Sequence, residues 1–188
     1  MGHEPRARGT SLWLMPEGAA RQSLTALIRR LADRLETAPF APHVTLLPGL
    51  AAPEPGVLDG ARALASELSS LELEPSGVDG LDQHFRCLFF RIGRSPALRN
   101  AHAGAARRFG RAPDPTFDPH LSLVYGSLDA TATADLTREL EPRVPAALVV
   151  RRLHVWRTEG AVREWRELAA FDLGPGGAVD ASGKPLVT

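Results

Sequence analysis

The residues best suited to chemistry stand in two copies of one short pattern. "PHVTL" and "PHLSL" each read Pro, His, an aliphatic residue, a hydroxyl residue and Leu. Near neutral pH, one of His43 and His120 can take a proton from water while the other gives a proton to a leaving oxygen. Thr45 and Ser122 can donate hydrogen bonds to phosphate oxygens, which become more negative in the transition state. This set suits in-line, metal-independent hydrolysis of a phosphodiester, above all of a strained cyclic phosphate.

Chance is a poor explanation for the doubling of this pattern. At average residue frequencies, on the order of one chain of this length per thousand would carry a single match. The chain has six histidines, and those outside the two copies match the pattern nowhere. A core histidine that caps a backbone group, next to an ordinary strand hydroxyl, would explain either copy alone. It does not explain the matched pair, so we interpret the two copies as parts of one site.

Strand geometry sorts each copy into two faces. Residues i and i+2 of a strand point the same way, so His43 and Thr45 share one face while Val44 and Leu46 share the other. The second copy divides in the same manner. Each strand therefore offers an apolar face to a core and an imidazole-plus-hydroxyl face to something polar, and the two polar faces can meet across a cleft.

Hydrophobic periodicity predicts the elements that must position the two copies. Helices are expected near 19–36, 57–69, 96–109 and 130–140, the third with Ser95 as its N-cap and Pro96 in its first turn. Strands are expected near 10–15, 43–47, 70–78, 86–92, 120–125, 147–157 and 162–172, the last two forming a hairpin. This order indicates an α+β protein of two related lobes, each contributing one copy. We assign 10–173 to a single bilobal domain, and 1–9 and 174–188 to flexible tails.

Composition limits the class of protein. The 188 residues include 22 basic and 22 acidic side chains, so the formal net charge is zero and extended nucleic acid is an unfavourable partner. A local basic pocket for a small anion stays open. Cys87 is the only cysteine, which rules out an internal disulfide framework. No signal peptide or membrane-spanning run is recognisable, so we expect a soluble, cytoplasmic monomer with no membrane partner and no cofactor.

The chain resembles the 2H phosphoesterase superfamily, and within it the cyclic nucleotide phosphodiesterases. The two patterns carry the resemblance, supported by "SLWLMP" near the start and "HVWRTEG" and "WRELAAFDL" near the end. The resemblance covers roughly 11–173 and implies a bilobal α+β fold with a cleft between pseudo-symmetric lobes, each with an antiparallel sheet and helices. It also implies metal-independent cleavage of 2′,3′-cyclic nucleotides or ADP-ribose 1″,2″-cyclic phosphate to the 2′-type phosphomonoester, with His43, Thr45, His120 and Ser122 as the site.

The resemblance further implies a division of labour. His120 would activate water, and His43 would protonate the departing 3′-oxygen. The near-symmetry of the two copies leaves either histidine able to serve either role. Tyr125 and Trp13 would line the pocket. Strand parity turns Tyr125 away from His120 unless the strand twists or ends before Gly126, and Trp13 would either stack on a base or pack at the edge of the core.

Three other functions compete with this interpretation. The first is a related RNA-end enzyme, resembling the bacterial 2′-5′ RNA ligases, that acts on a short RNA 2′,3′-cyclic phosphate. The second is a nucleotide-binding sensor without turnover, and the third is a metal hydrolase, for which no acidic residue stands at a ligand-like spacing. Two further groups of residues each have a functional and a structural interpretation. His154 and Trp156 would either line the rim of the cleft or pack between the lobes. A basic cluster would either bind a phosphate or lie at a solvated helix end: Arg107, Arg108 and Arg111.

Overall fold

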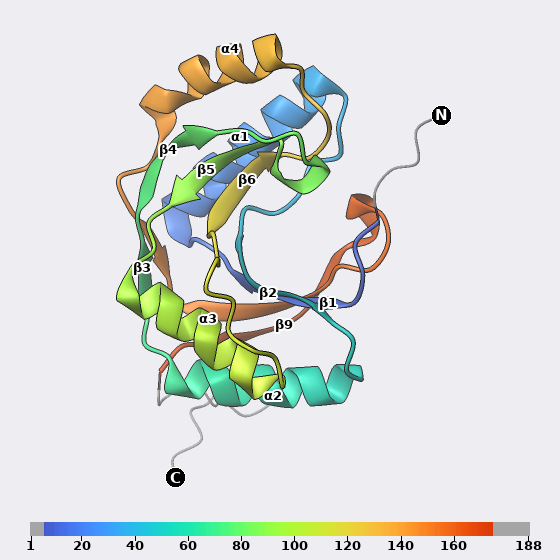
Figure 1. Ribbon diagram of the computed structural model, residues 1–188, viewed down its shortest axis with the longest axis vertical. Helices are drawn as coiled ribbons and strands as arrows, with labels where there is room; N and C mark the ends of the chain where they lie inside the picture. Colours follow the sequence, from blue (N-terminus) through green and yellow to red (C-terminus); the bar gives the residue numbers. More distant parts are fainter. Residues whose placement is uncertain (1–5, 175–188) are drawn as a thin grey trace.

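The computed structural model describes residues 6–174, and its main element is one antiparallel sheet (Figure 1). The seven strands stand in the order β4-β5-β6-β2-β1-β8-β9. Their bounds are β1 Thr10–Leu14, β2 Val44–Leu50, β4 Pro75–Asp79, β5 Leu88–Ile92, β6 His120–Val124, β8 Arg152–Arg157 and β9 Arg166–Asp172. A second, two-stranded sheet pairs β3 (Leu71–Leu73) with β7 (Leu148–Val150). The α+β fold class is thereby confirmed.

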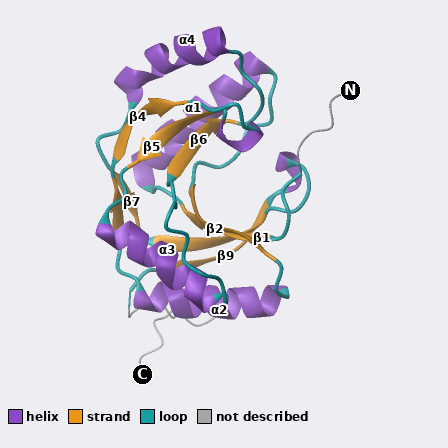
Figure 2. Cartoon of the chain, viewed as in Figure 1, coloured by secondary structure: helices purple, strands orange, loops and turns teal. Residues whose placement is uncertain are grey.

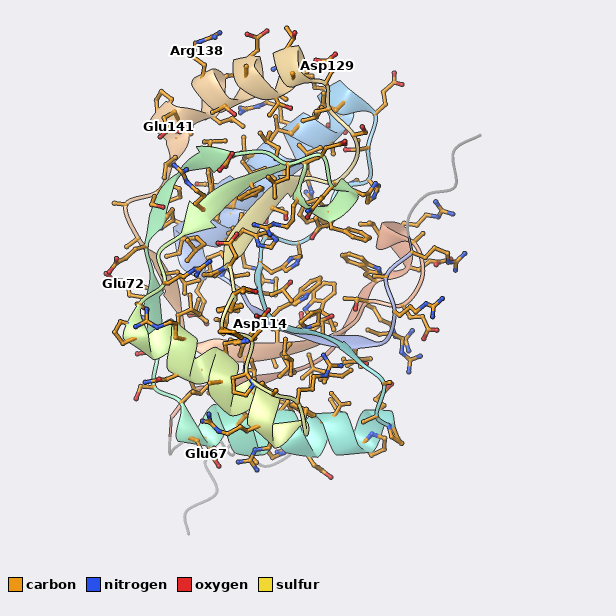
Figure 3. All side chains as sticks on the ribbon, viewed as in Figure 1. Glu67, Glu72, Asp114, Asp129, Arg138 and Glu141 are labelled. Carbon is orange, nitrogen blue, oxygen red and sulfur yellow. The ribbon has the colours of Figure 1, made fainter. Side chains whose placement is uncertain are left out.

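Four α-helices and three short 3₁₀ turns complete the described part of the chain. The helices are α1 Gly18–Leu35, α2 Glu54–Glu67, α3 Pro96–Arg108 and α4 Ala130–Leu140, and the turns are η1 His84–Arg86, η2 Glu141–Arg143 and η3 Val162–Glu164. Helices lie on the outer sides of the strands (Figure 2). Charged side chains such as Arg138 on α4 and Glu67 on α2 point outward (Figure 3). Apolar rows such as Leu24, Ile28 and Leu31 on α1 are buried in the core.

The two copies of the pattern meet where the two halves of the sheet join. Strands β2 and β6 are neighbours, and Val44 lies opposite Leu121. An antiparallel register centred on this pair places His43 across from Ser122 and Thr45 across from His120. The apolar residues of both copies are fully buried in one core cluster. Both strands therefore turn one apolar face into the core, as strand parity predicts.

The lobes are not consecutive halves of the chain. Helix α1 packs on β6, although it precedes β2 in sequence, and α3 packs on β2, although it precedes β6. Figure 1 shows α1 and α4 beside β4, β5 and β6, whereas α2 and α3 lie beside β1, β2 and β9. Each motif strand is thus covered by a helix from the other half of the chain, and the chain crosses between lobes repeatedly.

These crossings explain where the predicted elements were wrong. The strand expected at 70–78 is two strands, because β3 pairs with β7 while β4 pairs with β5. The strand expected at 147–157 is likewise split into β7 and β8. The hairpin of β8 and β9 is confirmed, but its second strand begins only after the turn η3.

One helix cap agrees with the sequence prediction, and one chain end differs from it. Ser95 caps α3 as predicted, because its side chain accepts a hydrogen bond from the Leu98 amide. Residues 6–9 were expected in a flexible tail, yet Ala7 pairs with Gly160 in a β-bridge. The rest of that tail, 1–5, and residues 175–188 lie outside the described residues. Among the described helices, none has the length and apolarity needed to cross a bilayer.

Candidate active site

The structure brings all six candidate residues to one cavity of about 160 Å³. It lies where β1, β2 and β6 run side by side, and strands far apart in sequence contribute to it. The wall is formed by Ala7, Ser11, Trp13, His43, Thr45, Pro48, Phe85, His120, Ser122, Tyr125, Thr158 and Trp165. The polar faces of both copies therefore open into the same space.

The backbone fixes both imidazoles in the same way. His43 Nδ1 lies 2.7 Å from the carbonyl oxygen of Ala41, and His120 Nδ1 lies 2.9 Å from the carbonyl oxygen of Asp118. In each copy the acceptor is two residues before the histidine, across the proline that keeps this stretch extended. Nδ1–H then donates to the carbonyl, so Nε2 carries the lone pair in the neutral ring. Both histidines can exchange protons through Nε2.

His43 is buried beneath an indole. Its side chain is 4% exposed, and Trp13 stacks on it with ring centroids 3.5 Å apart and planes at 7°. The pairing of Trp13 with Thr45 across β1 and β2 sets this position. Loss of hydration on burial lowers the pKa of His43 to about 3, with a smaller contribution from His120. His43 is therefore neutral in the free protein at neutral pH.

His120 stands in a more open and more charged setting. Asp118, whose backbone holds the ring, is ion-paired through its carboxylate with Arg86 and, at 3.3 Å, with Arg94. Burial lowers the pKa of His120, the hydrogen bond to Asp118 opposes this, and the Arg86 charge adds to the lowering. The ring is only half-buried, so desolvation acts on it less fully than on His43.

The two hydroxyls differ in their partners. Ser122 donates a hydrogen bond of 3.0 Å to the carbonyl oxygen of Phe85. Within the part of the chain that the structure describes, the Thr45 hydroxyl makes no hydrogen bond. Thr45 is therefore ready to donate to an anion, whereas Ser122 must first release Phe85.

Tyr125 points into the cavity. Strand β6 ends at Val124, so the parity that would have turned Tyr125 away from His120 no longer applies. The hydroxyl lies 3.4 Å from His43 Nε2, and the ring stacks on Phe40 at 3.8 Å. Burial raises the pKa of Tyr125, which keeps the phenol protonated and able to donate.

Trp13 lines the cavity, but stacking on a base is excluded by its neighbours. His43 covers one face, and Trp156 stacks on the indole at 4.5 Å and 21°. The side chain is 1% exposed. Of the two alternatives for Trp13, the structure favours packing in the core, where the indole desolvates His43.

Two aromatic residues of the wall were missed from the sequence. Trp165 follows the turn η3 and lies edge-on to both Trp13 and Tyr125. Phe85 lies in η1, where its carbonyl holds Ser122. The sequence offered "WRELAAFDL" as a signal for the first, but strand parity could not place a residue beside an irregular turn.

The remaining candidates lie outside this cavity. His154 is buried and bonded to Glu167 at 2.9 Å, which gives it a packing role. Arg108 is ion-paired with Glu67, and Arg111 donates to backbone carbonyls at the end of β2. These two arginines do not line the cavity. Among the described residues, no group of three or more metal-ligating side chains is assembled.

Comparison with known proteins identifies the family to which the chain is similar. The model of the 2′-5′ RNA ligase superfamily matches residues 15–161. Solved structures similar in fold include LigT from Escherichia coli complexed with 3′-AMP, with 14% identity and a TM-score of 0.57 over 91% of this chain and 99% of that one. TT0787 from Thermus thermophilus has 20% identity and a TM-score of 0.55 over 90% and 98%. A search of curated protein sequences gave no significant match.

Proposed function

The chain belongs to the 2′-5′ RNA ligase superfamily of 2H phosphoesterases, and from this premise we propose that it hydrolyses a ribose 2′,3′-cyclic phosphate by general acid–base catalysis. The observation that carries the proposal is the shared cavity, into which two backbone-anchored imidazoles and two hydroxyls open. LigT, which shares this fold, has been crystallised with phosphate and with 3′-AMP.

The reaction needs two proton transfers. One neutral Nε2 takes a proton from water as the water oxygen bonds to phosphorus, and the other, protonated Nε2 gives its proton to the ribose oxygen whose bond to phosphorus breaks. Thr45 donates to a non-bridging oxygen as negative charge grows there, and Ser122 joins it on leaving Phe85. The product is an acyclic phosphomonoester, with one ribose hydroxyl restored.

Burial favours a particular assignment of the two histidines. When two histidines share one proton, the proton resides on the histidine with the higher pKa. Surroundings that separate the two pKa values therefore separate the acid from the base. His43 is the more deeply buried ring, so it is the base, and His120 is the acid. This reverses the roles that the family resemblance implies, in which His120 activates water.

Two substrates fit this chemistry. A small cyclic nucleotide is favoured by the zero net charge of the chain. An RNA 3′ end is favoured by a neighbouring cavity with three arginines in its lining: Arg21, Arg29 and Arg163. Both substrates present the same cyclic phosphate to the catalytic cavity.

The test is hydrolysis of adenosine 2′,3′-cyclic phosphate in ¹⁸O-water with EDTA present. We expect the 2′-monophosphate carrying one ¹⁸O on phosphorus, because water attacks directly and the 3′-oxygen leaves. Mainly 3′-product would reverse the placement of the ribose. Activity that EDTA abolishes and zinc or manganese restores would contradict the metal-independent mechanism. Tight binding without turnover would identify a nucleotide sensor.

A further inference from the structure

A larger cavity adjoins the catalytic one. Its volume is about 460 Å³, and both Trp13 and Trp165 line it as well as the catalytic cavity. Its aromatic lining also includes Phe40 and Trp156. The catalytic cavity alone is smaller than the 300–1,000 Å³ typical of sites for drug-sized ligands, and the second lies within that range. A nucleotide whose phosphate reacts beside His43 must therefore extend into neighbouring space.

The lining of this second cavity is also cationic. Arg21, Thr25 and Arg29 line it from α1, and their spacing of four residues places them in one row on the helix face. No carboxylate belongs to the lining, and no acidic group within the described residues forms an ion pair with Arg21 or Arg29. Two guanidinium forks about two helical turns apart, beside an aromatic lining, are well suited to a phosphate held between them.

Trp165 provides the aromatic surface that Trp13 does not. Both faces of Trp13 are covered, by His43 and by Trp156. The ring contacts of Trp165 within the described chain are edge-on with Trp13 and Tyr125 and tilted at 33° with Phe85, and none is a parallel stack. A planar base can therefore lie against Trp165 without displacing another ring.

We propose that this cavity binds the nucleoside whose cyclic phosphate is hydrolysed, together with a second phosphate on its 5′-oxygen. The base lies against Trp165, and Arg21 and Arg29 bind the 5′-phosphate. This inference rests on the proposed function and sharpens it, because it selects substrates with two phosphates over simple 2′,3′-cyclic nucleotides. The second phosphate can belong to a nucleotide or to the preceding link of an RNA chain.

Three substrates test the proposal: adenosine 2′,3′-cyclic phosphate, its 5′-phosphorylated form, and the dinucleotide ApA ending in a 2′,3′-cyclic phosphate. We expect kcat/KM to rise by about tenfold or more with the second phosphate, as for charge-assisted hydrogen bonds. Arg21→Ala and Arg29→Ala should each remove most of that ratio. Arg30→Ala is the matched control, because the next residue of α1 lines a different cavity and should keep the ratio.

The outcomes separate this inference from the proposed function. A gain for both two-phosphate substrates supports the site, and a gain for the dinucleotide alone supports it and assigns it to an RNA end. Equal kcat/KM for all three substrates overturns it while the proposed function stands. If none is hydrolysed, the proposed function fails. Binding of adenosine 5′-monophosphate and of adenosine, measured by tryptophan fluorescence, then tests the phosphate site in the second cavity. Tighter binding of the monophosphate that Arg29→Ala abolishes supports it, and equal binding overturns it.

Discussion

The copy of the pattern on β2 and the copy on β6 have the same backbone arrangement and different surroundings. In both, the imidazole bonds through Nδ1 to the carbonyl two residues earlier. Across the sheet, however, Thr45 on β2 faces Trp13, whereas His120 on β6 faces Arg91. The first histidine is therefore desolvated under an indole, and the second stands near charge and solvent. The repeated sequence therefore gives both histidines the same hydrogen-bond geometry, and the neighbouring strands set the pKa of each ring.

The largest expected difference between the two histidines is the rescue of only one of their alanine variants by a better leaving group. If His120 is the acid, His120→Ala should slow hydrolysis of adenosine 2′,3′-cyclic phosphate by about 10²–10⁴. Replacing the leaving 3′-oxygen by sulfur should restore most of the rate, because a thiolate leaves without a proton. His43→Ala should not be rescued. Rescue of His43→Ala instead would return the two histidines to the roles that the family resemblance implies.

The two hydroxyls give a smaller contrast. Thr45→Val removes the hydroxyl and keeps the shape, and we expect kcat/KM to fall by about tenfold or more, as for loss of a hydrogen bond to a charged group. Ser122→Ala should cost less, because that hydroxyl must first break its bond to Phe85. Steady-state kinetics with melting temperatures as a folding control make the measurement. A larger loss of kcat/KM for Ser122→Ala would show that the hydrogen bonds of the free protein do not predict which hydroxyl contributes more to catalysis.

The smallest effect concerns pH. The base must be neutral and the acid protonated, so kcat/KM should rise through the pKa of His43, about 3, and fall through that of His120, which burial holds below its usual value of about 6.5. The optimum should lie on the acid side of 6.5.

The Trp13→Phe variant tests the cause of this shift. Phenylalanine covers His43 less than tryptophan does, so the pKa of His43 should rise and the acidic limb of the pH profile should move to higher pH by less than about one unit. NMR titration of His43 would check the shift, and an unchanged or lower pKa would contradict it.

Local patterns predicted the parts of this site that depend on local geometry. Strand parity and the doubled pattern located His43, Thr45, His120 and Ser122, which the structure brings to one cavity. The same reasoning could not find that Trp156 covers the outer face of Trp13, because that contact joins strands more than a hundred residues apart. Nor could it find that α1 packs on β6 and α3 on β2. Periodicity shows that a helix has an apolar face, but not which strands of the sheet that face covers.

The central claim is that His43 and His120 act together on one phosphate. The most direct measurement is the turnover of adenosine 2′,3′-cyclic phosphate by His43→Ala, His120→Ala and the double variant. Each single variant should lose about 10²–10⁴, and the double variant should be no more than about tenfold slower than the worse single variant, because groups that act as a unit are not additive. Losses that multiply in the double variant, or a single variant with a near-normal rate, would contradict the account.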